Sequence, residues 1–328
     1  MSSWLRPPAL RPGDRVAVVA PSGPVPPERL EPGLALLRAR YEVVHAPGLR
    51  SRTGYLAGED GRRLAELRWA LSDPSVQAVF CARGGYGLLR YLPALCAVPE
   101  AERRPVPVVG FSDITVLHAW AASARLTTIH GPVLTQLVSL PPEDVEALFA
   151  LLEHPGHPPP LEGLVTLRPG RARGRLLGGN LELLSRLCGT ALSSALRPGE
   201  PVVLLLEEIG EQPYRIDRAL TQLRLSGALD EVVGVVLGDF VACEGGDGAT
   251  PSALSVVVER LDALGVPLCS GAPIGHGTRN RAVPLGARVE LDADAGVLRF
   301  YDGAVSVGAP GVVSPLRPEG LCAQAGPP

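Results

Sequence analysis

Short apolar runs alternate with amphipathic stretches through the first half of the chain, and this alternation limits the possible folds more than any other feature. Residues 15–20 (RVAVVA), 76–81 (VQAVFC) and the valine-rich run before Gly110 predict buried strands. Residues 60–71 and 145–152 predict helices. Strands that alternate with helices in this way form a parallel, doubly wound sheet. Ligands of such sheets bind beyond the carboxyl ends of the strands, so the turns that follow the strands are candidate functional sites.

A proline-rich segment separates this half from a second half that has a different pattern of predicted strands and helices. Residues 154–161 (HPGHPPPL) cannot form a helix or an inner strand, because proline lacks an N–H group and has a fixed φ. We therefore predict an N-terminal α/β domain over residues 1–153, a linker over 154–172 and a C-terminal mixed α/β domain over 173–328. Near the end of the chain, residues 287–291 and 297–301 predict an antiparallel hairpin.

Composition argues against several classes of function. The formal net charge is −3, so no basic surface for nucleic acid is expected. The six cysteines are scattered without a CxxC pair, which argues against a metal or redox centre and favours free thiols in a reducing cytoplasm. The N-terminus lacks the apolar core of a secretory signal, and no apolar run is long enough to span a membrane. We therefore expect a cytoplasmic protein without a membrane or nucleic-acid partner.

The turn Gly110-Phe111-Ser112-Asp113 follows one of the predicted strands and precedes a predicted helix. A serine on such a turn has the geometry of a nucleophile elbow, in which its hydroxyl and the next backbone N–H face the same spot. Serine and aspartate are also favoured helix caps, so a capping role for Ser112 or Asp113 is the alternative interpretation.

A serine nucleophile needs a base and an orienting carboxylate, and the second half of the chain offers both. Glu207 follows five apolar residues at a strand end, where a carboxylate is costly without a partner. Its alternative role is a structural ion pair with Arg215 or Arg218. His276 lies between glycines in a loop, where no packing role is evident. The order Ser112, Glu207, His276 is that of the α/β-hydrolases, but Ile114 replaces the second glycine of their GxSxG elbow.

The other histidines are weaker candidates for the base. His118 lies well along the helix after Ser112 and is expected to pack against the sheet, whereas His130 ends a predicted strand and remains open as a base. The remaining three lie at an early strand end or in the proline-rich segment, namely His45, His154 and His157.

The glycine-rich turn Arg83-Gly84-Gly85-Tyr86-Gly87 has two interpretations, a phosphate cradle or an oxyanion-hole loop. Neither of the common nucleotide-binding glycine motifs is present, which disfavours the cradle. In the second interpretation, the N–H groups of Gly85 and Asp113 would form the oxyanion hole.

Together these segments resemble the LD-carboxypeptidase family of serine peptidases, which includes the microcin C immunity peptidase. The resemblance extends over nearly the whole chain, and its motifs occur in the family's order. The matching segments include RPGDRVAVVAPSGP (11–24), ARGGYG (82–87), VVGFSDITVLH (108–118), IHGPV (129–133), LLGGNLELLSRLCGT (176–190), LLLEEIGEQPYRIDRALTQLRLSG (204–227), PIGHG (273–277) and VPLGARVELDADAGVL (283–298).

The resemblance implies an N-terminal parallel-sheet domain similar to flavodoxins and class I glutamine amidotransferases, and a barrel-like mixed α/β C-terminal domain. It implies a Ser112–His276–Glu207 triad, an oxyanion hole from the amides of Gly85 and Asp113, a homodimer, and no metal or organic cofactor. Asn180, in the GGN segment, is a predicted substrate contact.

The implied activity is removal of the terminal D-alanine from murein tetrapeptides by a cytoplasmic carboxypeptidase, with a muropeptide as substrate. Such an enzyme must bind a free carboxylate, and Arg83 is one candidate for that role. The alternative is a microcin-immunity-type peptidase that cleaves aminoacyl-nucleotide antibiotics. That activity favours an aromatic residue for stacking on the base, but all three tryptophans precede the linker. A non-catalytic sugar- or nucleotide-binding module is a third possibility, and it leaves Glu207 and His276 without a role.

Overall fold

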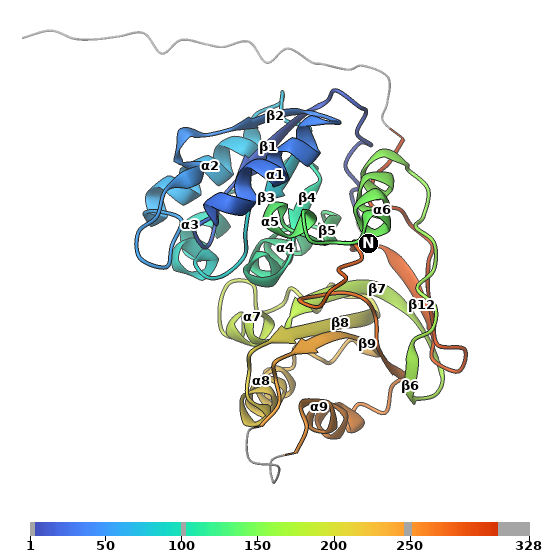
Figure 1. The fold of residues 1–328 in the computed structure, drawn as a ribbon. Helices are drawn as coiled ribbons and strands as arrows, with labels where there is room; N and C mark the ends of the chain where they lie inside the picture. The colour runs from blue at the N-terminus through green and yellow to red at the C-terminus, as the bar shows by residue number, and fades with distance from the viewer. Residues whose placement is uncertain (1–3, 100–102, 246–250, 308–328) are drawn as a thin grey trace, which may run out of the picture.

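A computed structural model describes residues 4–99, 103–245 and 251–307, and these residues form two β-sheets with helices packed against them (Figure 1). Thirteen strands are defined among them, six in the first sheet and seven in the second. Cys322 and the other residues after 307 lie outside the described residues.

The first sheet is parallel in its N-terminal part, as the alternation of elements predicts. Its strand order is β11-β5-β4-β3-β1-β2. The five strands from the first half pair in parallel, and β11 pairs antiparallel with β5 at one edge. The strands are β1 (Arg15–Val19), β2 (Glu42–His45), β3 (Ala78–Cys81), β4 (Val108–Gly110), β5 (Thr128–His130) and β11 (Val283–Leu285).

Helices cover both faces of this sheet because successive residues of its inner strands point to opposite faces. Val16 and Val18 of β1 belong to a core with the first group of helices, whereas Ala17 and Val19 belong to a core with the second group. The first group is α1 (Pro27–Arg38), α5 (Leu134–Leu137) and α6 (Pro142–Glu153), and the second is α2 (Asp60–Ser72), α3 (Leu92–Cys96) and α4 (Thr115–Ser123).

The second sheet is mixed, with the order β13-β12-β7-β8-β9-β10-β6. Strands β7 to β10 pair in parallel, and β6, β12 and β13 pair antiparallel. These strands are β6 (Val165–Arg168), β7 (Arg171–Asn180), β8 (Val202–Ile209), β9 (Val232–Val241), β10 (Leu268–Ser270), β12 (Arg288–Asp292) and β13 (Val297–Phe300).

One face of this sheet is covered by helices, and the other is curled around its own core. The outer face packs on α7 (Leu181–Arg186), α8 (Pro213–Leu225) and α9 (Ala253–Asp262). The inner core joins Leu205 of β8 with Leu291 of β12 and Leu298 of β13. The predicted barrel-like mixed domain and the predicted hairpin, now β12–β13, are therefore confirmed.

The two sheets do not divide at the predicted linker. Residues 154–172 contain all of β6, and Arg171 already begins β7. Only the proline-rich part is a connecting segment. β6 (VTLR) is an edge strand of four residues, and its alternation of apolar and polar side chains is too short to predict a strand from sequence. In addition, β11 crosses back from the second half into the first sheet, where Ala282 and Val305 join the core.

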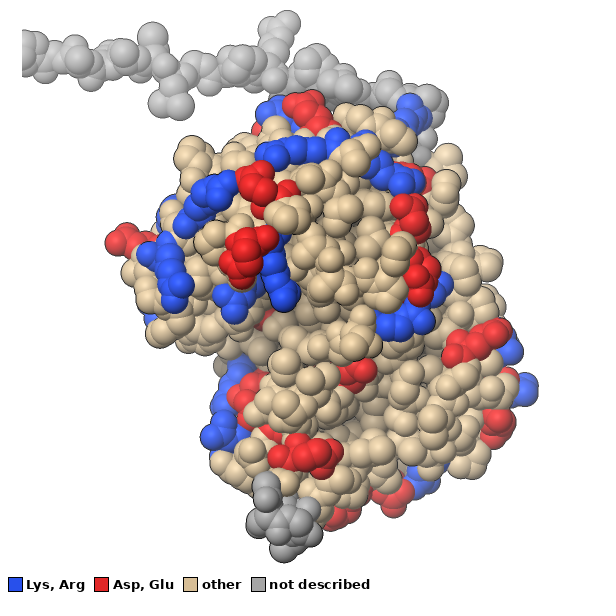
Figure 2. Space-filling view, viewed as in Figure 1, with Lys and Arg blue, Asp and Glu red and all other residues tan. Residues whose placement is uncertain are grey.

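Acidic and basic side chains are interspersed over the visible face of the molecule (Figure 2), in agreement with the small net charge. Among the described residues, no helix combines the length and the apolar character needed to cross a bilayer. The same residues hold no cluster of three or more histidine, cysteine, aspartate or glutamate side chains arranged for a metal ion.

Candidate active site

The turn after β4 has the backbone of a nucleophile elbow. Ser112 has φ = 64°, a left-handed conformation that is uncommon for residues other than glycine and is concentrated at functional sites. It begins a 3₁₀ turn over Ser112–Ile114 that continues into α4. Gly110 permits this tight entry, because a Cβ there would lie 2.9 Å from the Ile114 side chain. The turn places Ser112 just after β4, at the carboxyl end of the strand, as the sequence predicts.

The capping interpretation of Ser112 is not what the structure shows. The N-cap residues of the 3₁₀ turn and of α4 are Phe111 and Ile114, and neither end has a side-chain cap hydrogen bond. The Asp113 carboxylate instead faces another loop, where its Oδ2 accepts from Ser22 Oγ at 2.6 Å and from the Leu88 N–H at 3.0 Å. Burial raises the pKa of Asp113, and these hydrogen bonds oppose that rise. Asp113 thus ties the elbow to the loop after β3.

That loop brings glycine backbone directly against Ser112. A Cβ on Gly84 would lie 2.8 Å from the Ser112 Cβ and 3.0 Å from its Oγ, so no side chain fits there. The Gly84 carbonyl accepts from the Gly23 N–H at 2.9 Å, which fixes the loop on the turn after β1. Gly85 has φ = 98°, and its amide has no hydrogen-bond acceptor within the described part of the chain. The oxyanion-hole role of the Gly85 and Asp113 amides stays a prediction.

Glu207 and His276 form a buried pair. Glu207 lies on β8 with no exposed surface, and its Oε2 accepts from His276 Nδ1 at 2.6 Å. The predicted alternative, an ion pair with Arg215 or Arg218, is wrong: Arg215 bonds Glu211 and Tyr214, and Arg218 lies over the Tyr214 ring. A carboxylate that accepts from Nδ1–H leaves Nε2 of the imidazole free to accept a proton.

The loop that carries His276 is fixed to the N-terminal domain. Asn280 Oδ1 accepts from the Gly275 N–H at 3.1 Å, and Asn280 Nδ2 donates to Gln136 Oε1 at 2.8 Å. Next to it, Arg279 forms a two-pronged ion pair with the fully buried Asp144 of α6. The loop then continues into β11 of the first sheet. These contacts deliver a histidine from the second half of the chain to the carboxyl end of the first sheet.

Phe111 joins the two halves of the site. Its ring centroid lies 4.6 Å from that of His276 at an interplanar angle of 50°, and its neighbour in the chain is Ser112. Among the described residues Ser112 Oγ makes no hydrogen bond to His276. Such catalytic hydrogen bonds are often long without substrate and tighten when it binds. Phe111 therefore links Ser112, its neighbour in the chain, to the Glu207–His276 pair.

The two remaining candidate bases, His118 and His130, are both buried. His130 is fully buried, and its ring stands 6.0 Å from Phe111 with neither nitrogen hydrogen-bonded to another described residue. Burial holds the pKa of His130 well below its usual range. A group with no exposed surface cannot meet a substrate, so His130 is not the base. His118 is buried against the sheet, which confirms its predicted packing role.

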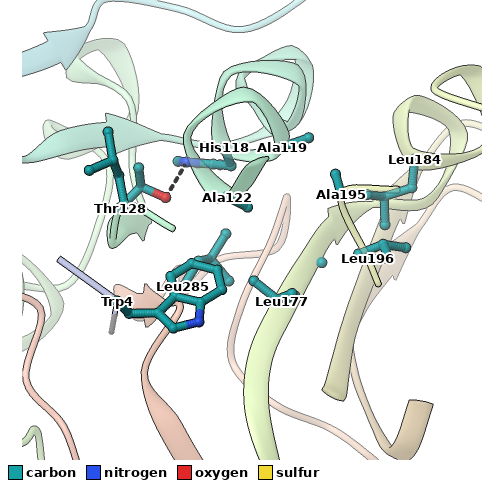
Figure 3. Close-up of a pocket in the computed structure, with 12 residues that line it drawn as sticks. Trp4, His118, Ala119, Ala122, Thr128, Leu177, Leu184, Ala195, Leu196 and Leu285 are labelled. Carbon is teal, nitrogen blue, oxygen red and sulfur yellow. Dashed lines mark hydrogen bonds between the residues drawn. The ribbon is translucent and has the colours of Figure 1, made fainter. Parts of the chain in front are cut away.

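The two hydrogen bonds of His118 define which ring nitrogen carries the proton in its neutral form. Nε2 donates to the Gly110 carbonyl at 2.8 Å, and Nδ1 accepts from Thr128 Oγ1 at 2.9 Å, the bond drawn in Figure 3. Burial lowers the pKa of His118 to about 4. In the unfolded chain His118 therefore binds a proton near pH 6.5, whereas in the folded protein it binds one only near pH 4.

We expect this difference to make stability fall with acidity. As the pH drops from 6.5 towards 4, His118 alone lowers the free energy of unfolding by roughly 3 kcal/mol. His118→Gln offers a donor and an acceptor to the same two partners without the titration, so its stability changes less over this window, whereas exposed His45→Gln serves as the control. Urea unfolding at several pH values measures the slopes, and equal slopes in wild type and His118→Gln would contradict the assignment.

Asn180 is placed where β7 meets α7. Its Oδ1 caps the helix by accepting from the Leu183 N–H at 3.1 Å, and its Nδ2 donates to Glu208 Oε1 at 2.9 Å. Its backbone N–H donates to Thr115 Oγ1 of α4 at 3.0 Å, which joins the two domains behind the elbow. Burial raises the pKa of Glu208 to about 7. Asn180 is 2% exposed, and its substrate contact stays a prediction.

Several residues of this site have no signal in the sequence. Gln136, Asn280 and the pair Asp144–Arg279 come from separate elements, and each is an ordinary polar residue in its own segment. Arg83, considered for a substrate carboxylate, donates from Nη1 to the Pro24 carbonyl at 2.7 Å.

Comparisons with known proteins identify the family of this chain. Residues 16–131 match the LD-carboxypeptidase N-terminal domain, and residues 173–291 match the LD-carboxypeptidase C-terminal domain. A Streptomyces coelicolor protein with a provisional carboxypeptidase name is 45% identical over 306 residues, covering 91% of this chain and 96% of its own. The murein tetrapeptide carboxypeptidase of Pseudomonas aeruginosa is 35% identical over 291 residues, which cover 85% of this chain and 94% of that protein.

Solved structures show the same fold. The muramoyltetrapeptide carboxypeptidase from Oxalobacter formigenes has a TM-score of 0.75 at 25% identity, covering 89% of this chain and all of that one. The microcin C7 self-immunity protein MccF, in complex with glutamyl sulfamoyl guanosine, has a TM-score of 0.79 at 21% identity. The match covers 92% of this chain and all of that one. With both domains matched in order and relatives above 30% identity along most of its length, the chain belongs to the LD-carboxypeptidase family.

Proposed function

We propose that this protein is a serine-type LD-carboxypeptidase that releases the C-terminal D-alanine of murein tetrapeptides. The observation that supports it most strongly is the buried Glu207–His276 pair beside the strained Ser112 turn. The Pseudomonas aeruginosa relative, named a murein tetrapeptide carboxypeptidase, supports the choice of substrate.

Acylation follows from the roles of these three side chains. Ser112 Oγ attacks the carbonyl carbon of the bond between an L-centre and D-alanine, and Nε2 of His276 takes the serine proton. Glu207 holds the imidazole by Nδ1 and stabilises the positive charge that it gains. When the tetrahedral intermediate collapses, the C–N bond breaks and the leaving D-alanine nitrogen takes that proton.

Deacylation uses the same groups in reverse order. A water molecule attacks the Ser112 ester while His276 removes its proton, and His276 then returns a proton to Ser112 as the tripeptide leaves. In both steps negative charge develops on the former carbonyl oxygen. The amides of Gly85 and Asp113 are the proposed donors to it, and the close approach of the glycine loop to Ser112 supports this role.

The substrate test compares two peptide chemistries in parallel. We expect incubation with disaccharide-tetrapeptide to yield the tripeptide and free D-alanine by mass spectrometry, and the same peptide ending in L-alanine to stay intact. Aspartyl sulfamoyl adenosine, which is bound in a solved structure of MccF, represents the aminoacyl-nucleotide alternative. Cleavage of that compound without release of D-alanine would replace the proposed substrate by the alternative one.

A further inference from the structure

A β-bulge in β9 lies directly beside the Glu207–His276 pair. Leu206 pairs with Leu237 and Glu208 pairs with Phe240, so Glu207 alone faces two residues of β9, Gly238 and Asp239. An extra residue of this kind locally re-aims a strand, and bulges are over-represented next to active sites. A Cβ on Gly238 would lie 2.3 Å from the Ile274 carbonyl oxygen, so only glycine fits this bulge without a shift.

The bulge turns Asp239 towards the loop that carries His276. The Asp239 N–H donates to the Ile274 carbonyl at 2.9 Å, and its Oδ2 accepts from the Gly277 N–H at 3.0 Å. A Cβ on Gly277 would lie 2.6 Å from that oxygen, and one on Gly275, which has φ = 128°, would lie 3.0 Å from Glu207 Oε2. Asp239 therefore excludes a side chain after His276, and Glu207 together with the positive φ disfavours one before it, which gives the glycine–histidine–glycine sequence a physical reason.

Three titratable side chains consequently lie near the His276 imidazole or its loop, two carboxyl groups and one uncharged histidine. Glu207 bonds Nδ1, Asp239 holds the loop backbone one residue further on, and His130 stands beyond the Phe111 ring. Partial burial raises the pKa of Asp239, while the Gly277 N–H and the charge of His276 lower it. His130 carries no charge near neutral pH, because burial holds its pKa well below the usual value. His276 is thus held by two carboxyl groups, Glu207 at its ring and Asp239 at the following backbone N–H.

We infer that Asp239 is a positioning residue for the proposed general base, fixing the backbone of the His276 loop through the Gly277 N–H. This inference rests on the proposed function only where it calls His276 the general base. The contact itself can be tested without any substrate.

The test separates the charge of Asp239 from its hydrogen bond. Asp239→Asn keeps an acceptor for the Gly277 N–H and removes the charge, whereas Asp239→Ala removes both. Exposed Asp230→Asn, a loss of one carboxylate in the same domain, is the control. In Asp239→Ala we expect the Gly277 amide hydrogen to exchange with solvent about tenfold faster than in wild type, measured by NMR, because the hydrogen bond that protects it is lost. Asp239→Asn keeps the acceptor, and we expect its exchange rate to stay close to that of wild type.

Activity provides a second readout. In Asp239→Ala, kcat for D-alanine release falls about tenfold with KM unchanged, since the loop no longer fixes His276 for proton transfer, and Asp239→Asn recovers most of that loss. A Gly277 exchange rate identical in wild type, Asp230→Asn and Asp239→Ala overturns the inference, whatever the activity. Wild-type protein that releases no D-alanine overturns the proposed function instead, and the NMR comparison still decides on Asp239.

Discussion

Ser112→Ala is expected to lower kcat for D-alanine release by about four to six orders of magnitude, the loss found when the nucleophile of a serine peptidase is removed. The variant loses the only atom that forms the acyl-enzyme bond, while His276, Glu207 and the glycine loop stay in place. Since alanine is no more strained than serine at φ = 64°, the fold and its melting temperature should change little.

The matched control for this experiment is Ser123→Ala, at the other end of α4. Ser123 Oγ donates to the Trp120 carbonyl at 2.7 Å and lies far along the helix from the elbow. Rates are measured as D-alanine released per enzyme over hours, so that a residual activity of one part in ten thousand is detectable. Ser112→Ala with a kcat within tenfold of wild type would rule out Ser112 as the nucleophile.

Local patterns were sufficient to predict most of the first sheet. Strands β1, β3 and β4 are short apolar runs, and their alternation with helices specifies a parallel sheet without knowledge of distant contacts. β11 shows where this stops. It has only three residues, Val283–Leu285, and its partner β5 lies about half the chain away, so no local pattern indicates that it leaves the second domain.

The same distinction applies to the candidate site. Ser112 was predictable from a strand-to-helix turn, and Glu207 from the cost of a carboxylate after a buried strand. The glycines around His276 were visible, but the reason for Gly277 was not, because Asp239 reaches it only through the bulge in β9. Tertiary pairing decides such contacts, as it does for Gln136 with Asn280, and a single sequence does not encode them in any local period.

Glu207→Gln is expected to reduce kcat by about three to four orders of magnitude through the tautomer of His276. In the wild type, Oε2 accepts from Nδ1–H, and Oε1 is buried without a hydrogen-bond partner among the described residues. A glutamine must place its NH2 group at one of these two positions. At the Oε1 position both amide hydrogens would be buried unpaired, which costs more than an unpaired carbonyl oxygen.

The favoured orientation of the substituted glutamine therefore aims its NH2 group at Nδ1, so that the imidazole proton moves to Nε2. That nitrogen then cannot accept the Ser112 proton, and the negative charge that stabilises the imidazolium is gone as well. Proton NMR should show loss of the downfield Nδ1–H signal in Glu207→Gln but not in Glu211→Gln, a nearby change outside the pair. Retention of that signal together with a kcat within tenfold of wild type would show that Glu207 does not orient the base.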